Sequence, residues 1–263
     1  MKKSTSALKW GRLLDEFPFV RLGDKKRALI IFPWISDALE DVSVNPGRVW
    51  WLCSSLADGY KVYIIGRKRG LPAGYTTRDA AADYARVFES IIGPADIMGI
   101  SMGGLIAQHF AVDFPQYVKS LVIGCSAYRV GEKELVQYWE TLARENRWRK
   151  LYLNMAAVSF SGFSGYFFGG MQLFAKKPDS LSDFIVSVNA CLQHDTFDRL
   201  KVIEARTLVI GGLLDRLFPE PLFRETARHI PSASLHLMKG VGHAAFAQHK
   251  EEFNSAVKSF LSH

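Results

Sequence analysis

Short apolar runs rich in β-branched residues alternate with longer stretches of helical periodicity along most of this 263-residue chain. Such alternation is typical of βα units, which build a mainly parallel sheet covered by helices on both faces. We predict strands at Arg27–Phe32, Lys61–Ile65, Ala95–Ile100, Ser120–Cys125, Thr207–Gly211 and Ser234–Met238, with a further strand at Phe17–Leu22 at an edge. The pattern predicts an α/β fold.

Two stretches between and after these strands have the spacing of amphipathic helices. Residues 79–92 place one apolar face at helical spacing, formed by Ala80, Ala81, Tyr84, Val87, Phe88, Ile91 and Ile92, before Gly93-Pro94 ends the pattern. The last helix repeats the spacing with Phe246, Phe253, Val257, Phe260 and Leu261. Both helices are expected to pack on the sheet.

The alternation stops between about Tyr128 and Glu204, where helical patterns occur without a convincing strand. We therefore predict an α/β core formed by residues 1–128 and 205–263, with residues 129–204 inserted as a helical cap. No residue from Leu151 to Ala175 is charged, and aromatic residues crowd this stretch, but glycines and polar residues interrupt it, so it lacks a transmembrane span. We expect a buried or lid segment that faces an apolar substrate. Ordinary packing within the cap is the alternative, and a membrane-surface role is the weakest of the three interpretations.

The charge pattern argues against a nucleic-acid partner. The formal net charge is +7, but the basic residues gather only in short groups at 25–27, 67–69 and 147–150, without a basic stripe or a recognition motif. We interpret these groups as solvated faces. Cys53, Cys125 and Cys191 lie far apart in apolar surroundings, and no apolar stretch of signal-peptide length occurs near the start, so we expect free buried thiols and a cytoplasmic protein.

The sequence Gly99-Ile-Ser101-Met-Gly103 follows a predicted strand and precedes an apolar helical pattern. Glycines on both sides of the serine relieve crowding at a sharp strand-to-helix turn, which holds the serine in a strained, exposed position above the sheet. A glycine-rich packing turn is the alternative. The context favours Ser101 as a catalytic nucleophile.

A serine hydroxyl needs a base to take its proton and a third group to hold that base. Asp215 lies in the loop after the strand at 207–211, and His243 lies in a glycine-containing loop after the next strand. Open α/β sheets build their sites in such loops, and the order Ser, Asp, His is the expected one. The other histidines lack this setting and are weaker candidates for the base.

These motifs resemble those of the α/β-hydrolase family over nearly the whole chain outside the cap. The matching stretches are Leu29–Trp34, Leu71–Thr76, Gly99–Gln108, Thr207–Pro219 and Gly240–Phe246, and the Ser-Met-Gly-Gly variant is similar to that of enol-lactonases, carbon–carbon bond hydrolases and small-molecule esterases. The resemblance implies a cap-lined pocket and cofactor-free chemistry at Ser101, Asp215 and His243.

One stretch departs from the family pattern. The family usually has His-Gly after the third strand, where this chain has Pro33-Trp34 followed by Ile35. By analogy, the backbone N–H of Ile35, or of Trp34 as second choice, would join the Met102 N–H in an oxyanion hole, since Pro33 has no N–H. For the substrate pocket we expect Trp34, Phe160, Phe163, Phe167 and Phe168.

The function expected is a serine hydrolase that cleaves a carboxylic ester or related acyl bond of a small to medium apolar substrate through an acyl-enzyme. The alternatives are a lactonase, thioesterase, carbon–carbon bond hydrolase or acyltransferase with the same triad, or a ligand-binding or signalling protein of this fold with little turnover. The chain lacks a phosphate-binding glycine loop and any histidine–acid cluster besides the triad, so we predict no cofactor and no metal. A small-molecule acyl substrate is the partner expected, and the sequence assigns no oligomeric state.

Overall fold

The computed structural model describes residues 8–162, 175–178 and 180–262, and these contain one eight-stranded sheet in the order β1-β2-β4-β3-β5-β6-β7-β8. The strands from β4 to β8 in this order run parallel to one another, whereas β2 is antiparallel to both of its neighbours, β1 and β4. Their bounds are β1 Lys9–Leu13, β2 Phe17–Leu22, β3 Ala28–Phe32, β4 Lys61–Ile65, β5 Ala95–Ile100, β6 Val118–Gly124, β7 Arg206–Gly212 and β8 Ala233–Met238. The predicted α/β fold with a mainly parallel sheet is confirmed.

The one misplaced strand is β2. Its predicted residues are right, but β2 is not at an edge, because β1 pairs with it on the outside and β4 on the inside. Strand β1 contains Lys9, Gly11 and Arg12 and is largely exposed, so it lacks the apolar run that marks the other strands. The edge is formed by a strand that the hydrophobic pattern does not predict.

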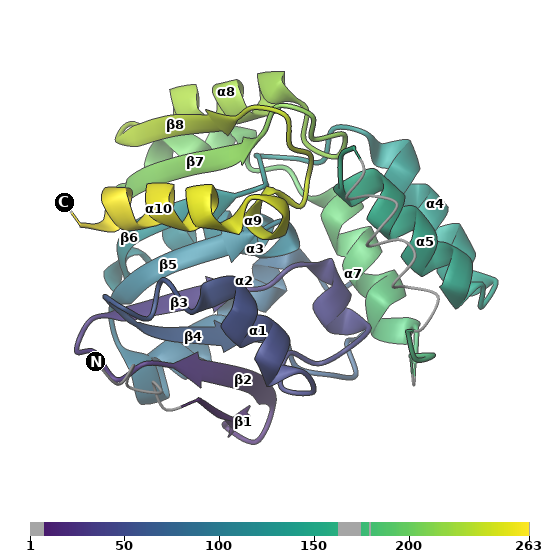
Figure 1. Cartoon of the computed structure of the whole chain (residues 1–263), viewed down its shortest axis with the longest axis horizontal. Coiled ribbons are helices and arrows are strands. Elements are labelled where there is room, and N and C mark those ends of the chain that lie inside the picture. Colours follow the sequence, from purple (N-terminus) through teal and green to yellow (C-terminus); the bar gives the residue numbers. More distant parts are fainter. Residues whose placement is uncertain (1–7, 163–174, 179, 263) are drawn as a thin grey trace.

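Helices cover both faces of the sheet (Figure 1). On one face, α1 (Pro46–Cys53), α9 (Ala245–Gln248) and α10 (Lys250–Leu261) contribute to one apolar core, with Phe253, Val257 and Leu261 fully buried. On the other face, α2 (Thr77–Val87), α3 (Met102–Asp113) and α8 (Glu220–His229) contribute to a second core. Short 3-10 helices lie at η1 (Ile35–Ala38), η3 (Pro115–Tyr117) and η4 (Phe197–Val202).

The helix predicted at 79–92 begins two residues earlier and changes form near its end. Thr76 and Asp79 form a capping box that starts α2 at Thr77, and the π-helical turn η2 (Phe88–Ile92) continues it to Gly93. The buried face contains Ala80, Ala81, Tyr84, Val87 and Phe88, as predicted, but Ile91 is 51% exposed. Its assignment to that face is wrong, because the π-helical turn shifts the spacing of side chains.

Three described α-helices lie between β6 and β7: α4 (Lys133–Arg144), α5 (Trp148–Ser159) and α7 (Ser182–Gln193). Figure 1 shows them together beyond the end of the sheet at which the parallel strands finish. Asp183 at the start of α7 accepts hydrogen bonds from the backbone N–H groups of Gly70 (3.0 Å) and Leu71 (2.9 Å), which joins this helical insertion to the core. The insertion agrees with the expected cap, whose limits at 129 and 204 stay a prediction.

The charged and thiol groups only partly follow expectation. Arg67 is 2% exposed, so the interpretation of residues 67–69 as a solvated face is wrong at that position. Cys53, Cys125 and Cys191 are free and buried, as predicted. Among the described residues, no helix has the length and apolar character needed to cross a membrane.

Candidate active site

Ser101 occupies the sharp turn between β5 and α3. Its φ of 56° and ψ of −120° lie in a region that side-chain-bearing residues rarely adopt, and such strain persists only where the surroundings enforce it. The strained turn is therefore present, but Ser101 is only 6% exposed. The expectation of an exposed serine is wrong, because the helical insertion covers this end of the sheet.

Two glycines allow this turn to pack closely on its neighbours. A Cβ on Gly99 would lie 2.2 Å from the carbonyl oxygen of Gly103, and a Cβ on Gly103 would lie 1.9 Å from the carbonyl oxygen of Phe32. Any larger residue would push α3 away from β3 and β5. The glycines of the motif thus fix both the turn and the distance between the start of α3 and the end of β3.

The loops after β7 and β8 bring Asp215 and His243 to Ser101. Nε2 of His243 lies 2.8 Å from Oγ of Ser101, and Nδ1 of His243 lies 2.9 Å from Oδ2 of Asp215. Oδ1 of Asp215 accepts hydrogen bonds from the backbone N–H groups of Leu217 (2.9 Å) and Phe218 (3.0 Å). The three residues predicted as a triad form one continuous hydrogen-bonded chain.

The three side chains of this hydrogen-bonded series are buried away from solvent. Asp215 is 4% and His243 6% exposed, and the ring of Phe218 stacks on the imidazole at 5.7 Å between centroids. Exclusion of water strengthens the interactions among such groups, and the two backbone donors stabilise the Asp215 carboxylate. A carboxylate so held keeps the proton on Nδ1 of the imidazole, which leaves Nε2 free to accept the serine proton.

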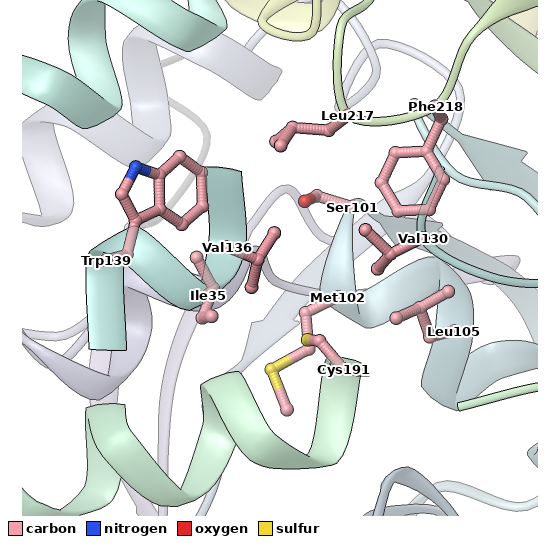
Figure 2. A pocket seen from close by; sticks show the side chains of 10 residues that line it. All are labelled: Ile35, Ser101, Met102, Leu105, Val130, Val136, Trp139, Cys191, Leu217 and Phe218. Atoms are coloured by element: carbon pink, nitrogen blue, oxygen red, sulfur yellow. The ribbon is translucent and has the colours of Figure 1, made fainter. Parts of the chain in front are cut away.

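A cavity of about 20 Å³ lies beside Ser101 and has room for about one water molecule. Figure 2 shows the Ser101 hydroxyl directed into the space enclosed by Trp139, Val136 and Leu217. The remaining lining residues are Ile35, Met102, Leu105, Val130, Cys191 and Phe218, so the described lining contains no charged side chain. Burial raises the pKa of the Cys191 thiol to about 12, so the sulfur at the cavity is uncharged at neutral pH.

The residues predicted to form the pocket differ from those that line this cavity. The ring of Trp34 stacks on Phe246 at 5.0 Å, and neither Trp34 nor Phe160 is among the described lining residues. Phe163, Phe167 and Phe168 lie outside the described residues. Val136 and Trp139 of α4 were missed; their spacing of three marks one helix face, but nothing in the sequence says that this face meets Ser101.

The three candidate oxyanion donors lie at the starts of two helical segments. Met102 is the first residue of α3 and Ile35 the first of η1, with Trp34 immediately before it. The first N–H groups of a helix have no acceptor within that helix, so they are available to a ligand. Met102 and Ile35 both line the cavity with Ser101. Their function as donors stays a prediction.

The loop that carries His243 is hydrogen-bonded to the end of α5. The Ala244 N–H donates to the Ser159 carbonyl oxygen at 2.8 Å. Oγ of Ser161 donates to the Gly240 carbonyl oxygen at 3.0 Å, and Nε2 of Gln248 donates to the Ser161 carbonyl oxygen at 3.0 Å. These bonds connect the insertion directly to the predicted base.

Two other histidines are buried near one another but away from this chain of bonds. Burial lowers the pKa of His109 to about 4 and lowers that of His194 well below its usual value. His109 accepts a hydrogen bond on Nδ1 from Arg199 at 2.9 Å, and Nδ1 of His194 lies 2.8 Å from Oγ1 of Thr77. No cluster of three metal-binding side chains occurs within the described part of the chain.

Comparison with known proteins places the chain among related sequences and folds. Residues 44–256 match the model of the alpha/beta hydrolase family. A Pseudomonas protein named 2-hydroxy-6-oxononadienedioate/2-hydroxy-6-oxononatrienedioate hydrolase is 28% identical over 222 residues, which cover 78% of each chain. The structure is similar to the enol-lactonase from Burkholderia xenovorans (TM-score 0.81, 16% identity, 97% and 100% of the two chains covered) and to an esterase from Exiguobacterium antarcticum (0.74, 17%, 94% and 96%).

Proposed function

The chain belongs to the alpha/beta hydrolase family, and from that premise we propose that it cleaves a carboxylic ester or related acyl bond of a small to medium apolar substrate through an acyl-enzyme at Ser101. The observation that carries the proposal is the chain of short contacts from Ser101 through His243 to Asp215 beside an apolar cavity. These contacts supply a nucleophile, a base and an orienting acid, the three groups that acyl transfer of this kind uses.

In the proposed reaction, Oγ of Ser101 attacks the substrate carbonyl carbon while Nε2 of His243 takes the hydroxyl proton. The tetrahedral oxyanion is held by the N–H groups of Met102 and of Ile35 or Trp34. His243 then returns the proton to the leaving alcohol, and the same steps with water release the acid. General-base help of this kind is worth about 10² to 10⁴ in rate, and each oxyanion donor about 10² to 10³.

The chemistry of the cavity supports an uncharged acyl group. The described lining residues carry no charge, and the sequence has no charged residue from Leu151 to Ala175. A carboxylate that leaves water needs a basic partner, which these parts of the chain do not supply. The related Pseudomonas hydrolase is named for a dioate, a dicarboxylate, and we propose that this chain acts on a neutral acyl compound instead.

A second candidate is the hydrolysis of a lactone by the same residues. The Burkholderia enol-lactonase shares the fold of this chain, and the observation that favours a lactone is the uncharged lining of the cavity. An uncharged ring ester would meet the same apolar lining and the same nucleophile. Matched open-chain and ring esters of equal carbon number distinguish the two, since the preferred one has the higher kcat/KM.

The proposal is tested with nitrophenyl esters of acetate to octanoate. Ser101→Ala should lower kcat/KM at least about 10⁴-fold, and a fluorophosphonate should add to Ser101 in the unaltered protein only. Ser126→Ala is the matched control, because the buried Ser126 hydroxyl has no hydrogen-bond partner in the described structure, and its activity should be unchanged. Full activity in Ser101→Ala would contradict the proposal.

The substrate class needs a separate comparison. A hexanoate ester should exceed the corresponding adipate half-ester in kcat/KM at least about 100-fold, because the second carboxylate would lose its water without a basic partner. Equal rates for the two esters would show that a charged acyl group is accepted.

A further inference from the structure

Arg67 is an unusual residue because its guanidinium, two residues after the end of β4, is buried. It is 2% exposed, and it is among the largest side chains that the fold buries fully. Its neighbours Lys68 and Arg69 remain 27% and 30% exposed at their side chains. A buried charge is costly and gives little net stability, so a specific use for Arg67 should exist at this point.

The guanidinium is directed at the backbone of the loop between β3 and η1. Its terminal nitrogens lie 3.5 Å from the carbonyl oxygens of Pro33 and Trp34 and 3.3 Å from that of Ile35. These are long hydrogen bonds, and their strength comes from the charge of the guanidinium in a dry environment. One fork-shaped cation thus binds three consecutive carbonyl groups.

Asp37 balances this charge from within η1. Oδ2 of Asp37 lies 3.6 Å from the Arg67 guanidinium and accepts the backbone N–H of Arg67 at 2.9 Å. Gly66 before it leaves room for the carboxylate, since a Cβ there would lie 2.6 Å from Oδ1 of Asp37. The segment after β4 is therefore bound to the loop between β3 and η1 through its carbonyl groups and to η1 through Asp37.

This arrangement determines where the neighbouring N–H groups point. The described peptide bonds are all trans, so the N–H of each peptide points away from its C=O. With the Pro33 and Trp34 carbonyls held toward Arg67, the N–H groups of Trp34 and Ile35 face the opposite way. Ile35 lines the cavity with Ser101 and Met102. Charge at the carbonyl oxygen also polarises the peptide and makes its N–H a stronger donor.

We propose that Arg67 is a positioning residue that orients the Trp34 and Ile35 peptides as oxyanion donors for the reaction at Ser101. The inference rests on the function proposed above. Where the family usually has His-Gly, this chain has Pro33-Trp34, and the buried cation fixes the loop from behind. Arg67 touches no reacting atom and acts through the two peptides.

The experiment compares kcat and KM for a neutral ester and for its thiono analogue, in which sulfur replaces the carbonyl oxygen. Sulfur accepts hydrogen bonds weakly, so the preference for the oxygen ester measures how well the oxyanion donors work. Asp37→Asn/Arg67→Met removes both charges and keeps an acceptor for the N–H of residue 67, which avoids an unpaired buried charge. Arg67→Lys keeps the charge and loses the fork.

In the double variant, kcat for the oxygen ester should fall at least about tenfold, KM should change less than about threefold, and the oxygen-over-thiono preference should shrink at least about fivefold. Arg67→Lys should recover part of the preference. Arg27→Met/Asp96→Asn is the control, since it likewise removes both charges of an ion pair with a buried carboxylate, here at the start of β5, and should leave the preference unchanged. Rates are normalised to the concentration of sites titrated by a fluorophosphonate.

Two outcomes would overturn the inference in different ways. An unchanged oxygen-over-thiono preference in the double variant, beside an active unaltered protein, would assign Arg67 a purely structural role and leave the proposed function intact. No hydrolysis and no fluorophosphonate adduct in the unaltered protein would remove the proposed function and the role of Arg67 together.

Discussion

Gly103 and Phe32 approach so closely that a Cβ on the glycine would lie 1.9 Å from the Phe32 carbonyl oxygen. This contact sets the start of α3 against the end of β3, and with it the distance between Met102 and Ile35. Gly103→Ala should therefore lower the free energy of unfolding by at least about 3 kcal/mol, because backbone must move to admit the methyl group. Urea unfolding of the purified variant measures the loss.

Gly59→Ala provides the matched control for this substitution. No atom lies within 4 Å of a Cβ at Gly59, so its stability should change by less than about 0.5 kcal/mol. Equal stability of the two variants would mean that α3 packs less tightly on β3 than the Gly103–Phe32 contact indicates.

Asp215→Asn should separate the geometry of the triad from its chemistry. The amide can keep the two hydrogen bonds from Leu217 and Phe218 through Oδ1, but its NH₂ would donate to Nδ1 of His243. The imidazole would then carry its proton on Nε2 and could not accept one from Ser101, so kcat should fall about 10³- to 10⁴-fold. Steady-state kinetics at neutral pH measures the fall, and thermal unfolding shows whether the fold is kept; a loss below tenfold would exclude Asp215 as the orienting acid.

Trp139 should limit the length of the acyl chain. Its indole is 2% exposed at the cavity beside Ser101 and is fixed by a 2.8 Å hydrogen bond from Nε1 to Oδ1 of Asn154. Trp139→Leu opens space there, so the octanoate-over-acetate ratio of kcat/KM should rise at least about tenfold. Trp148→Leu on α5 is the control, because Trp148 is not among the cavity residues described and the ratio should stay constant.

Acid should destabilise the protein through His109 and His194. In the unfolded chain both histidines gain a proton near pH 6.5, whereas in the folded protein the pKa of His109 is about 4 and that of His194 is also lowered. Below pH 6.5 the unfolded state thus binds more protons than the folded state. The contribution of the two neutral histidines to the free energy of unfolding is fully present above pH 6.5 and is lost as the pH falls toward 4. His109 alone should account for about 3 kcal/mol across that window.

Urea unfolding at pH 7.5 and pH 5 tests this dependence. The variant His109→Asn/His194→Asn should show a smaller loss between the two pH values, since neither asparagine titrates while both keep polar groups toward Arg199 and Thr77. The same loss in the variant and in the unaltered protein would place the pH dependence in other groups.

The sheet was largely predictable because its parallel strands are buried on both faces. Strands such as Ala95–Ile100 are buried throughout and, apart from Asp96, apolar, and this signal is independent of the neighbours that the strand finally pairs with. Strand β1 escaped prediction because Lys9, Gly11 and Arg12 stand in an exposed edge position, where pairing with β2 rather than burial makes the strand. Local pattern carries no information about such pairing.

The candidate site was likewise predictable only in part: the triad was, and the cavity residues were not. Ser101, Asp215 and His243 could be placed together because each follows a strand of one parallel sheet, and the ends of such strands meet at one edge. The cavity residues could not be predicted, since they depend on how the insertion packs on the core. Trp34 illustrates this: its ring stacks on Phe246, while Val136 and Trp139 from α4 occupy the space above the serine.

The hydrogen bond from Ala244 to Ser159 has a consequence for how a substrate could enter. An outward swing of α5 would break this bond together with those of Ser161, and would pull on the segment that holds the imidazole. The end of α5 is therefore tied to the loop of His243, so that a displacement of α5 large enough to admit a ligand would also disturb the position of the imidazole.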